Sequence, residues 1–346
     1  MVRRHVARAI LLSIMLTGLV GCSPDEGDLS TSDKELALAD TARAVRQSPA
    51  KAGIKMLQVR YRNGEVFRYR AIQESEGGPD TARTTSKSTH YYTRIVRSTR
   101  SDGSYETVLR FDSITVSGTI RNMRTGATLM EQSYRSSDTT AVNRKRFPQF
   151  SSLIGEEVLV YISPDGRVQQ VGDVSPIVRK IALASSQPMP PAALEQVAAQ
   201  LKNGIYAAFT LQEFVPFPKQ PIDSSGTWVN EQQSPLSEIF TVLTRATYSI
   251  DRVYDLKGRR IGAVTANVVG SVRAIPLPKN SPLSISLQTS QITGSSSAVM
   301  DVDRGFTVSK KNQITMSMTA RVGLPQGGQQ TVTQSQTSRY EVELLP

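Results

Sequence analysis

Apolar and polar side chains alternate along most of this chain, and that alternation constrains the fold more than any other feature. Leu57, Val59 and Tyr61 take every second position, and the same period of two recurs at 67–71 and 105–120. Because successive side chains of a strand point to opposite faces of a sheet, each run predicts a half-buried strand. Short turns between such strands favour antiparallel pairing, so the predicted fold is mainly β. Further alternating or apolar runs lie at 91–99, 158–162, 168–171, 238–255, 259–275, 284–292, 297–309, 312–322 and 330–345.

The first two runs predict a hairpin, and its loop sets the register. A three-residue loop at 62–64, with Gly64 left-handed in a bulge, opposes Val59 to Phe67 and keeps one face of the hairpin apolar. Residues 75–88 are rich in Gly, Ser, Thr and charge. Such a composition predicts a loop between strands.

The middle of the chain changes to helical spacing. Pro176 suits the start of a short helix that runs to Leu183, and Pro191 suits the first turn of a second helix. Apolar residues of the second helix recur on one stripe, which contains Leu194, Val197, Ala198, Leu201, Ile205 and Ala208. The stripe predicts a face packed on a sheet, and a binding groove is the alternative.

These signals divide the chain into segments. We expect an N-terminal β-rich half at 51–172, a helical connector at 173–215 and a C-terminal β-rich half at 216–346. Residues 22–50 are expected to form a polar tether and a short helix. The predicted architecture is a set of antiparallel curved sheets, or an incomplete barrel, in two halves with the central helix packed across it.

The first 21 residues have the layout of an export signal. Arg3, Arg4 and Arg8 form a positively charged start, and residues 9–20 form a short apolar stretch. A membrane-spanning helix needs about 20 apolar residues, so this stretch is too short to remain as a span. We therefore expect residues 1–21 to be removed.

The sequence Leu19-Val20-Gly21-Cys22 closes this segment and holds the only cysteine in 346 residues. It resembles the lipobox of bacterial lipoproteins, in which the cysteine receives a diacylglycerol and the chain is cut before it. The resemblance implies cleavage between Gly21 and Cys22 and attachment of lipid to Cys22. With Ser23 next, it also implies a cell-envelope location on the outer membrane, facing the periplasm or the cell surface. An ordinary signal peptide with an unmodified cysteine is the alternative.

Charge and cysteine content limit the partners of the mature chain. The formal net charge of +11 falls to +8 when the three arginines of residues 1–21 are lost, and the remaining basic residues form no long run. Diffuse charge on an exported chain argues against nucleic acid as a partner. Arg60, Arg68 and Arg70 share the polar face of the predicted hairpin and form a possible anion-binding site for an envelope glycan or lipid. Without a second cysteine, the body must be stable through its core alone.

Candidate catalytic groups are few. After residue 21, His90 is the only histidine, which leaves no second histidine for a zinc site or a serine triad. Asp301 and Asp303 are two apart in a predicted strand and are candidates for a cation site or a hydrolase pair, with solvated turn acids as the alternative. Trp228 is either a sugar or lipid contact or a core anchor. The S-x-x-K spacing at 48–51 lacks its companion motifs, so we predict no enzyme, no metal site and no cofactor.

Pro216-Phe217-Pro218, Gly226-Thr227-Trp228 and the hairpin at 248–269 together resemble uncharacterised β-rich envelope lipoproteins over most of residues 50–345. The resemblance supplies no activity and no site residues. We predict a non-catalytic binding or structural role, with a possible envelope protein as partner. One alternative is a carrier for lipid or another apolar ligand, which predicts a dry cavity on the order of several hundred Å³. A second alternative is an envelope hydrolase that uses acidic residues.

Overall fold

The computed structural model describes residues 46–47, 53–54, 56–185, 188–222, 224–237, 239–256, 259–275, 284–323 and 329–346. The strands are β1 (Arg46–Gln47), β2 (Val66–Pro79), β3 (Ala82–Thr99), β4 (Tyr105–Asn122), β5 (Thr128–Arg135), β6 (Glu157–Ile162), β7 (Val168–Val171), β8 (Thr227–Ser237), β9 (Phe240–Leu256), β10 (Arg259–Ala274), β11 (Ser284–Asp301), β12 (Phe306–Gly323) and β13 (Gln329–Leu345). The helices are α3 (Ala141–Arg146), α4 (Pro148–Ser151), α5 (Ser175–Ala184), α6 (Pro191–Ala208) and the π-helix η1 (Phe209–Glu213). The cysteine Cys22, the cleavage site after Gly21 and the predicted short helix lie outside the described residues.

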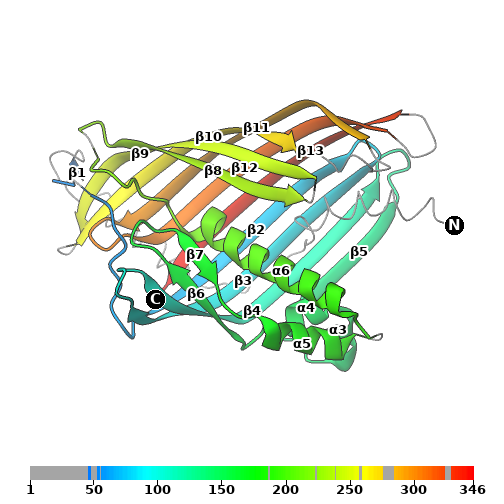
Figure 1. Ribbon diagram of the computed structural model, residues 1–346, viewed down its shortest axis with the longest axis horizontal. Coiled ribbons are helices and arrows are strands. Elements are labelled where there is room, and N and C mark those ends of the chain that lie inside the picture. The colour runs from blue at the N-terminus through cyan, green and yellow to red at the C-terminus, as the bar shows by residue number, and fades with distance from the viewer. Residues whose placement is uncertain are drawn as a thin grey trace.

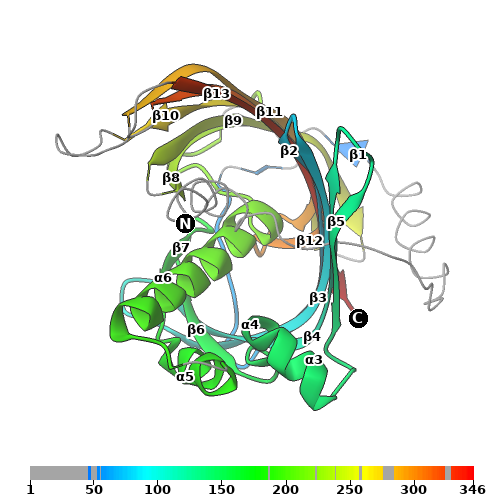
Figure 2. The same ribbon diagram turned by 90° about the vertical axis from the view of Figure 1, so that its right-hand side faces the viewer.

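All of these strands belong to one antiparallel sheet in the order β1-β9-β10-β11-β12-β13-β2-β3-β4-β6-β7, with β5 beside β4 and β8 beside β9. The sheet is strongly curved and does not close on itself, and α6 lies on its concave side (Figures 1 and 2). This arrangement confirms the predicted class, a mainly β fold built as an incomplete barrel.

The two predicted β-rich halves meet along β13 and β2. Twelve residue pairs join these strands, from Gln334 opposite Pro79 to Leu345 opposite Arg68. The sheet therefore continues from one half into the other, and the helical connector crosses its concave side (Figure 2). Both connector helices have the expected prolines, Pro176 and Pro191, in their first turn, where a proline loses no helical hydrogen bond.

The predicted loop at 75–88 is wrong. These residues form the ends of β2 and β3, which pair from Val66 opposite Ile95 to Gly77 opposite Thr84 and turn only at 80–81. The inward positions of this hairpin are small and polar, so the alternation that marks a strand is missing from the sequence. Likewise, the predicted strand at 297–309 contains a turn, because β11 ends at Asp301 and β12 begins at Phe306.

The predicted hairpin of 57–61 with 67–71 is also wrong. Residues 57–61 are extended but outside the sheet, and the neighbours of β2 are β13 and β3. The backbone N–H of Val59 instead donates to the carbonyl of Pro164 at 2.8 Å. The alternation still has its predicted meaning for burial, because Leu57, Val59 and Tyr61 are buried. Gly64 is left-handed as predicted, with φ of 80°.

The main core lies between the concave side of the sheet and the helical connector. It includes Tyr69 and Ile114 from the sheet, and Ile205, Phe209 and Phe217 from the connector and the segment after it. We call the end of the sheet with turns at 100–104, 163–166 and 303–305 the core end, and the end with turns at 80–81 and 123–127 the far end. Among the described residues, no helix combines the length and the apolar character needed to cross a bilayer.

Candidate functional site

The end of the helical connector is fixed to the sheet by a buried ion pair. Arg94 of β3 and Glu213 of η1 lie 2.6 Å apart (Nη2 to Oε1), and their side chains are 0% and 1% exposed. The Tyr92 hydroxyl donates to the other carboxylate oxygen of Glu213 at 2.7 Å. A π-helix is uncommon and often marks a functional position. Here it carries Glu213, the acid that pairs with the buried Arg94 of the sheet.

Aromatic rings surround the Arg94 guanidinium. The Arg94 Cζ atom lies 4.7 Å from the ring centres of both Tyr61 and Phe67, and 5.5 Å from that of Phe214. The Arg94 Nε and Nη1 atoms are buried with no hydrogen-bond acceptor among the described residues. Ring faces are negative and attract a cation, so these contacts partly replace the missing acceptors.

Strand β12 completes this group. Lys310 donates to the carbonyl oxygen of Phe214, and the Thr307 hydroxyl donates to the carbonyl oxygen of Glu213 at 2.6 Å. Burial lowers the pKa of Lys310 to about 7, although the charge of Glu213 acts against this. Burial also raises the pKa of Glu213, against the attraction of Arg94. We call Arg94, Glu213, Tyr92, Thr307 and Lys310 the Arg94 cluster.

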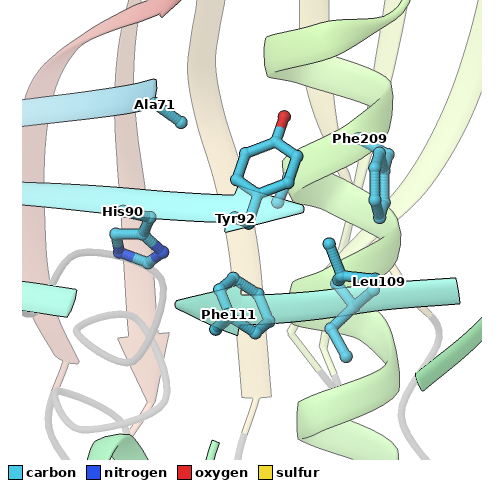
Figure 3. A pocket seen from close by; sticks show the side chains of 8 residues that line it. Ala71, His90, Tyr92, Leu109, Phe111 and Phe209 are labelled. Atoms are coloured by element: carbon cyan, nitrogen blue, oxygen red, sulfur yellow. The ribbon is translucent and has the colours of Figure 1, made fainter. Parts of the chain in front are cut away.

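Next to this cluster, the space between η1 and the sheet is nearly filled. A cavity of about 20 Å³ is lined by Ala71, His90, Tyr92, Leu109, Phe111, Ile205, Ala208 and Phe209 (Figure 3). That volume suits about one water molecule and no acyl chain. A larger space of about 260 Å³ opens at the core end. Its lining is mixed and includes the charged residues Asp165 and Lys219 beside apolar residues such as Leu57. Neither space matches the dry cavity expected of a carrier with a ligand beneath its helix.

His90 lines the small cavity. Its ring meets the ring of Phe111 edge-on, with centres 5.9 Å apart (Figure 3). Burial lowers its pKa to about 4, because the charged imidazolium is poorly solvated there. At neutral pH the imidazole is therefore uncharged.

The apolar stripe of α6 is only partly covered. Ile205 is buried, whereas Leu194, Val197, Ala198 and Leu201 are half-buried and pack against the core. The Arg94 cluster holds η1, which follows α6 directly, against the sheet. Helix α6 therefore lies on the concave side of the sheet (Figure 2), and its apolar stripe packs against the main core.

Toward the far end, the described inward residues of the concave face are uncharged. Strand register and burial identify the inward positions, and on these segments of β2, β3 and β8–β13 every charged residue takes an outward position. We call the inward residues here the neutral face: Gln73, Ser75, Thr84, Ser86, Ser88, Asn230, Gln232, Ser290, Ile292, Ser296, Asn312, Ile314, Met316, Met318, Gln334, Gln336 and Ser338.

The predicted acidic pair is engaged in structural contacts. Asp301 accepts from Arg259 at 2.7 Å and from the backbone N–H groups of Asp303 and Arg304. Asp303 pairs with Arg260, which lowers the pKa of that carboxyl. Both acids hold the turn between β11 and β12, and each faces its own arginine. Within the described ranges, no three His, Cys, Asp or Glu side chains are grouped as a metal ion would require.

The three arginines of the predicted anion-binding face lie on two segments, Arg60 outside the sheet and the other two on β2. Arg60 is exposed in the extended segment, where its backbone N–H donates to Arg304 at 2.8 Å. Arg68 and Arg70 occupy outward positions of β2, and Arg70 pairs with Glu343 at 2.6 Å. Anion binding by these residues stays a prediction.

Trp228 is 7% exposed, and its ring stacks on Tyr248 at 5.2 Å. Its indole N–H donates to the carbonyl of Pro216 at 2.8 Å, which is the contact of a core anchor.

Sequence reasoning missed the Arg94 cluster and the neutral face. Arg94 stands at the inward parity of Tyr92 and Val96, so a charge on the apolar side of a strand was the available signal. Its partner Glu213 lies 119 positions away in the chain, and no local pattern connects the two.

The fold and the site together define an open antiparallel half-barrel that is crossed by a helix and held by a buried ion pair. A family model described as "Family of unknown function (DUF6263)" matches residues 102–307. Because this match covers more than half of the chain, the protein belongs to that family. No curated protein matches the sequence.

Several solved structures match this chain at low identity and with TM-scores below 0.5. A lipovitellin chain, studied for its lipid–protein interactions, is 12% identical with a TM-score of 0.45, and the match covers 83% of this chain and 26% of that one. OccK7 (OpdD) of Pseudomonas aeruginosa is 6% identical with a TM-score of 0.26, covering 83% and 100% of the two chains. An outer membrane channel of Pseudomonas putida F1 is 8% identical with a TM-score of 0.15, covering 83% and 97%. This chain thus spans about a quarter of the lipovitellin chain.

Proposed function

We propose that this protein is a lipid-anchored envelope protein without catalytic activity that binds a ligand on the concave side of its half-barrel. The observation that carries the proposal is the half-buried apolar stripe of α6, held over a concave sheet face by the Arg94 cluster. A helix that only completed a core would bury its apolar stripe fully. A partly covered stripe on the concave side of an open sheet suits a ligand that completes the apolar contacts.

The charged groups support a non-catalytic role. Asp301 forms an ion pair with Arg259, and Asp303 forms one with Arg260. Glu213 forms a buried ion pair with Arg94. His90 is uncharged at neutral pH, since burial lowers its pKa to about 4, and such an imidazole is a weak base. Ion-paired acids and a buried, uncharged histidine are typical of residues that stabilise a fold.

The anchor follows from the lipobox resemblance at Leu19–Cys22. Each buried CH₂ of an acyl chain adds about 0.8 kcal/mol to membrane binding, so two or three chains on Cys22 would hold the protein at the envelope. The ligand side of the half-barrel would then work at the membrane surface, facing the periplasm or the cell surface.

The uncharged apolar dye N-phenyl-1-naphthylamine tests the binding role. We expect saturable, one-to-one binding by the full chain carrying Cys22→Ser, with increased dye fluorescence. The variant Leu201→Gln, in the stripe of α6, should weaken binding, whereas Gln200→Ala, on the exposed side of the same helix, should not. Dye binding that is absent, or that responds equally to both substitutions, would count against the proposal.

A further inference from the structure

We propose that the ligand is an uncharged amphiphile, with an acyl-like apolar part and a head that carries hydroxyl or amide groups, bound on the neutral face. This inference rests on the proposed function and adds the chemical class of the ligand. It is argued from the charge, the apolar contacts and the polar rows of that face.

The charge pattern excludes an ionic head at the far end. Glu74 and Glu76 of β2 point outward and pair with Lys87 at 3.0 Å and Arg83 at 2.7 Å. The inward positions that alternate with these two acids hold Gln73, Ser75 and Gly77. An ion taken out of water is strongly unfavourable unless an opposite charge compensates it, and the neutral face offers none. A neutral head therefore complements this face.

The apolar part has a matching surface on β9–β12. A second cluster of buried residues there consists of Phe240, Val272, Ile292, Met318 and Ala320. Ile314 and Met316 pack against this cluster and remain half-buried, so they are available to a ligand. Methionine is flexible and polarizable and adapts to chains of irregular shape. This cluster is separate from the main core at the other end of the sheet.

The polar head of the ligand would contact the strands next to this cluster, β13, β2 and β3. Strand pairing places Ile314 of β12 next to Ser338 of β13, which lies next to Ser75 of β2 and then Ser86 of β3. The neighbouring row runs from Met316 to Gln336 and on across β2 to β3. The face thus changes from apolar to hydroxyl and amide side chains between β12 and β13.

A buried hydroxyl group on the polar part of the neutral face, that of Thr84, supports binding of a polar head. The Thr84 hydroxyl oxygen is buried and has no hydrogen-bond partner among the described residues. Thr84 stands at the inward position opposite Gly77, at the β3 end of the row that starts at Met316. A buried hydroxyl usually has a partner, and the head of a bound amphiphile would supply one.

Three amphiphiles with the same dodecyl chain test the class of ligand. Calorimetric titration of the full chain carrying Cys22→Ser, below micelle-forming concentrations, compares dodecyl maltoside with dodecyl phosphate and dodecyltrimethylammonium. We expect dodecyl maltoside to bind at least tenfold more tightly than either charged compound. Equal binding of all three would overturn the ligand class, and if the naphthylamine dye still bound, the proposed binding role would stand.

A charge placed on the neutral face should invert this preference. Gln336→Glu changes one atom of a half-buried inward side chain, and we expect it to weaken dodecyl maltoside binding at least tenfold and to strengthen dodecyltrimethylammonium binding. Thr337→Glu, at the next outward position, is the matched control and should change neither affinity. The same effect from both variants, or no gain for the cation with Gln336→Glu, would overturn the proposal. Because the gain for the cation requires a folded protein, loss of folding cannot produce the expected result.

Discussion

Removal of Glu213 should destabilise the protein more than removal of Arg94. The Arg94 cluster holds two basic groups and one acid, all buried. Without Glu213, both Arg94 and Lys310 lose their only counter-charge in the cluster, whereas without Arg94 the acid can still be neutralised by Lys310. Stranding one partner of a buried ion pair costs about 3–5 kcal/mol. We therefore expect about that loss in the free energy of unfolding for Glu213→Gln, and about 1–3 kcal/mol for Arg94→Met.

Urea unfolding followed by the fluorescence of Trp228, the single tryptophan, measures these losses. Circular dichroism should give the same midpoint if unfolding is cooperative. An exposed pair provides the control: Arg97, on the same strand as Arg94, lies 2.8 Å from Glu157 of β6, and both side chains are about half exposed, so Arg97→Met should cost less than about 1 kcal/mol. A loss below about 1 kcal/mol for Glu213→Gln, or a larger loss for Arg94→Met, would refute this reasoning.

Further substitutions test other parts of the structure. His90 has a folded pKa lowered to about 4, so stability should fall as pH drops from about 6.5 to 4, by about 1–3 kcal/mol, and His90→Leu should remove that loss in urea titrations. Lys310 has a pKa lowered to about 7, so the unfolded chain holds the extra proton between pH 7 and about 10.4; stability should rise across this range, and Lys310→Met should flatten the rise. Gly305→Ala should lower the melting temperature, because Gly305 has φ of +67° and a Cβ there would lie 2.2 Å from the carbonyl oxygen of Gln58. The N-terminal peptide of the protein isolated from membranes should begin at Cys22 and carry the added mass of a lipid, and no such lipid-bearing peptide should be found for Cys22→Ser.

The parts of the fold that the sequence predicted are those where an apolar and a polar face alternate. The strand from Tyr105, the strands at 158–162 and 168–171 and the helix from Pro191 all carry that signal, and all are present. At 75–88 the inward face is polar and uncharged, so a real hairpin had the composition of a loop. The joining of β13 to β2 depends on residues more than 250 positions apart, which no local pattern encodes.

The candidate site was predictable only in its outline. The sequence indicated the helical connector and its apolar stripe, and it left open whether that stripe packs on a sheet or forms a groove. The Arg94 cluster depends on three segments that meet only in the folded chain. The spacing of Asp301 and Asp303 suggested a functional pair. In the structure, both acids instead lie at the turn between β11 and β12, where each carboxylate accepts a hydrogen bond from a backbone N–H group and pairs with an arginine.

Native mass spectrometry of the full chain carrying Cys22→Ser, purified from the envelope and compared with the denatured chain, tests the central claim most directly. Our account predicts a stoichiometric additional mass in the range of a lipid-like amphiphile, lost on denaturation and depleted in Gln336→Glu but not in Thr337→Glu. A bare chain, with no additional mass under conditions that preserve non-covalent complexes, would contradict it.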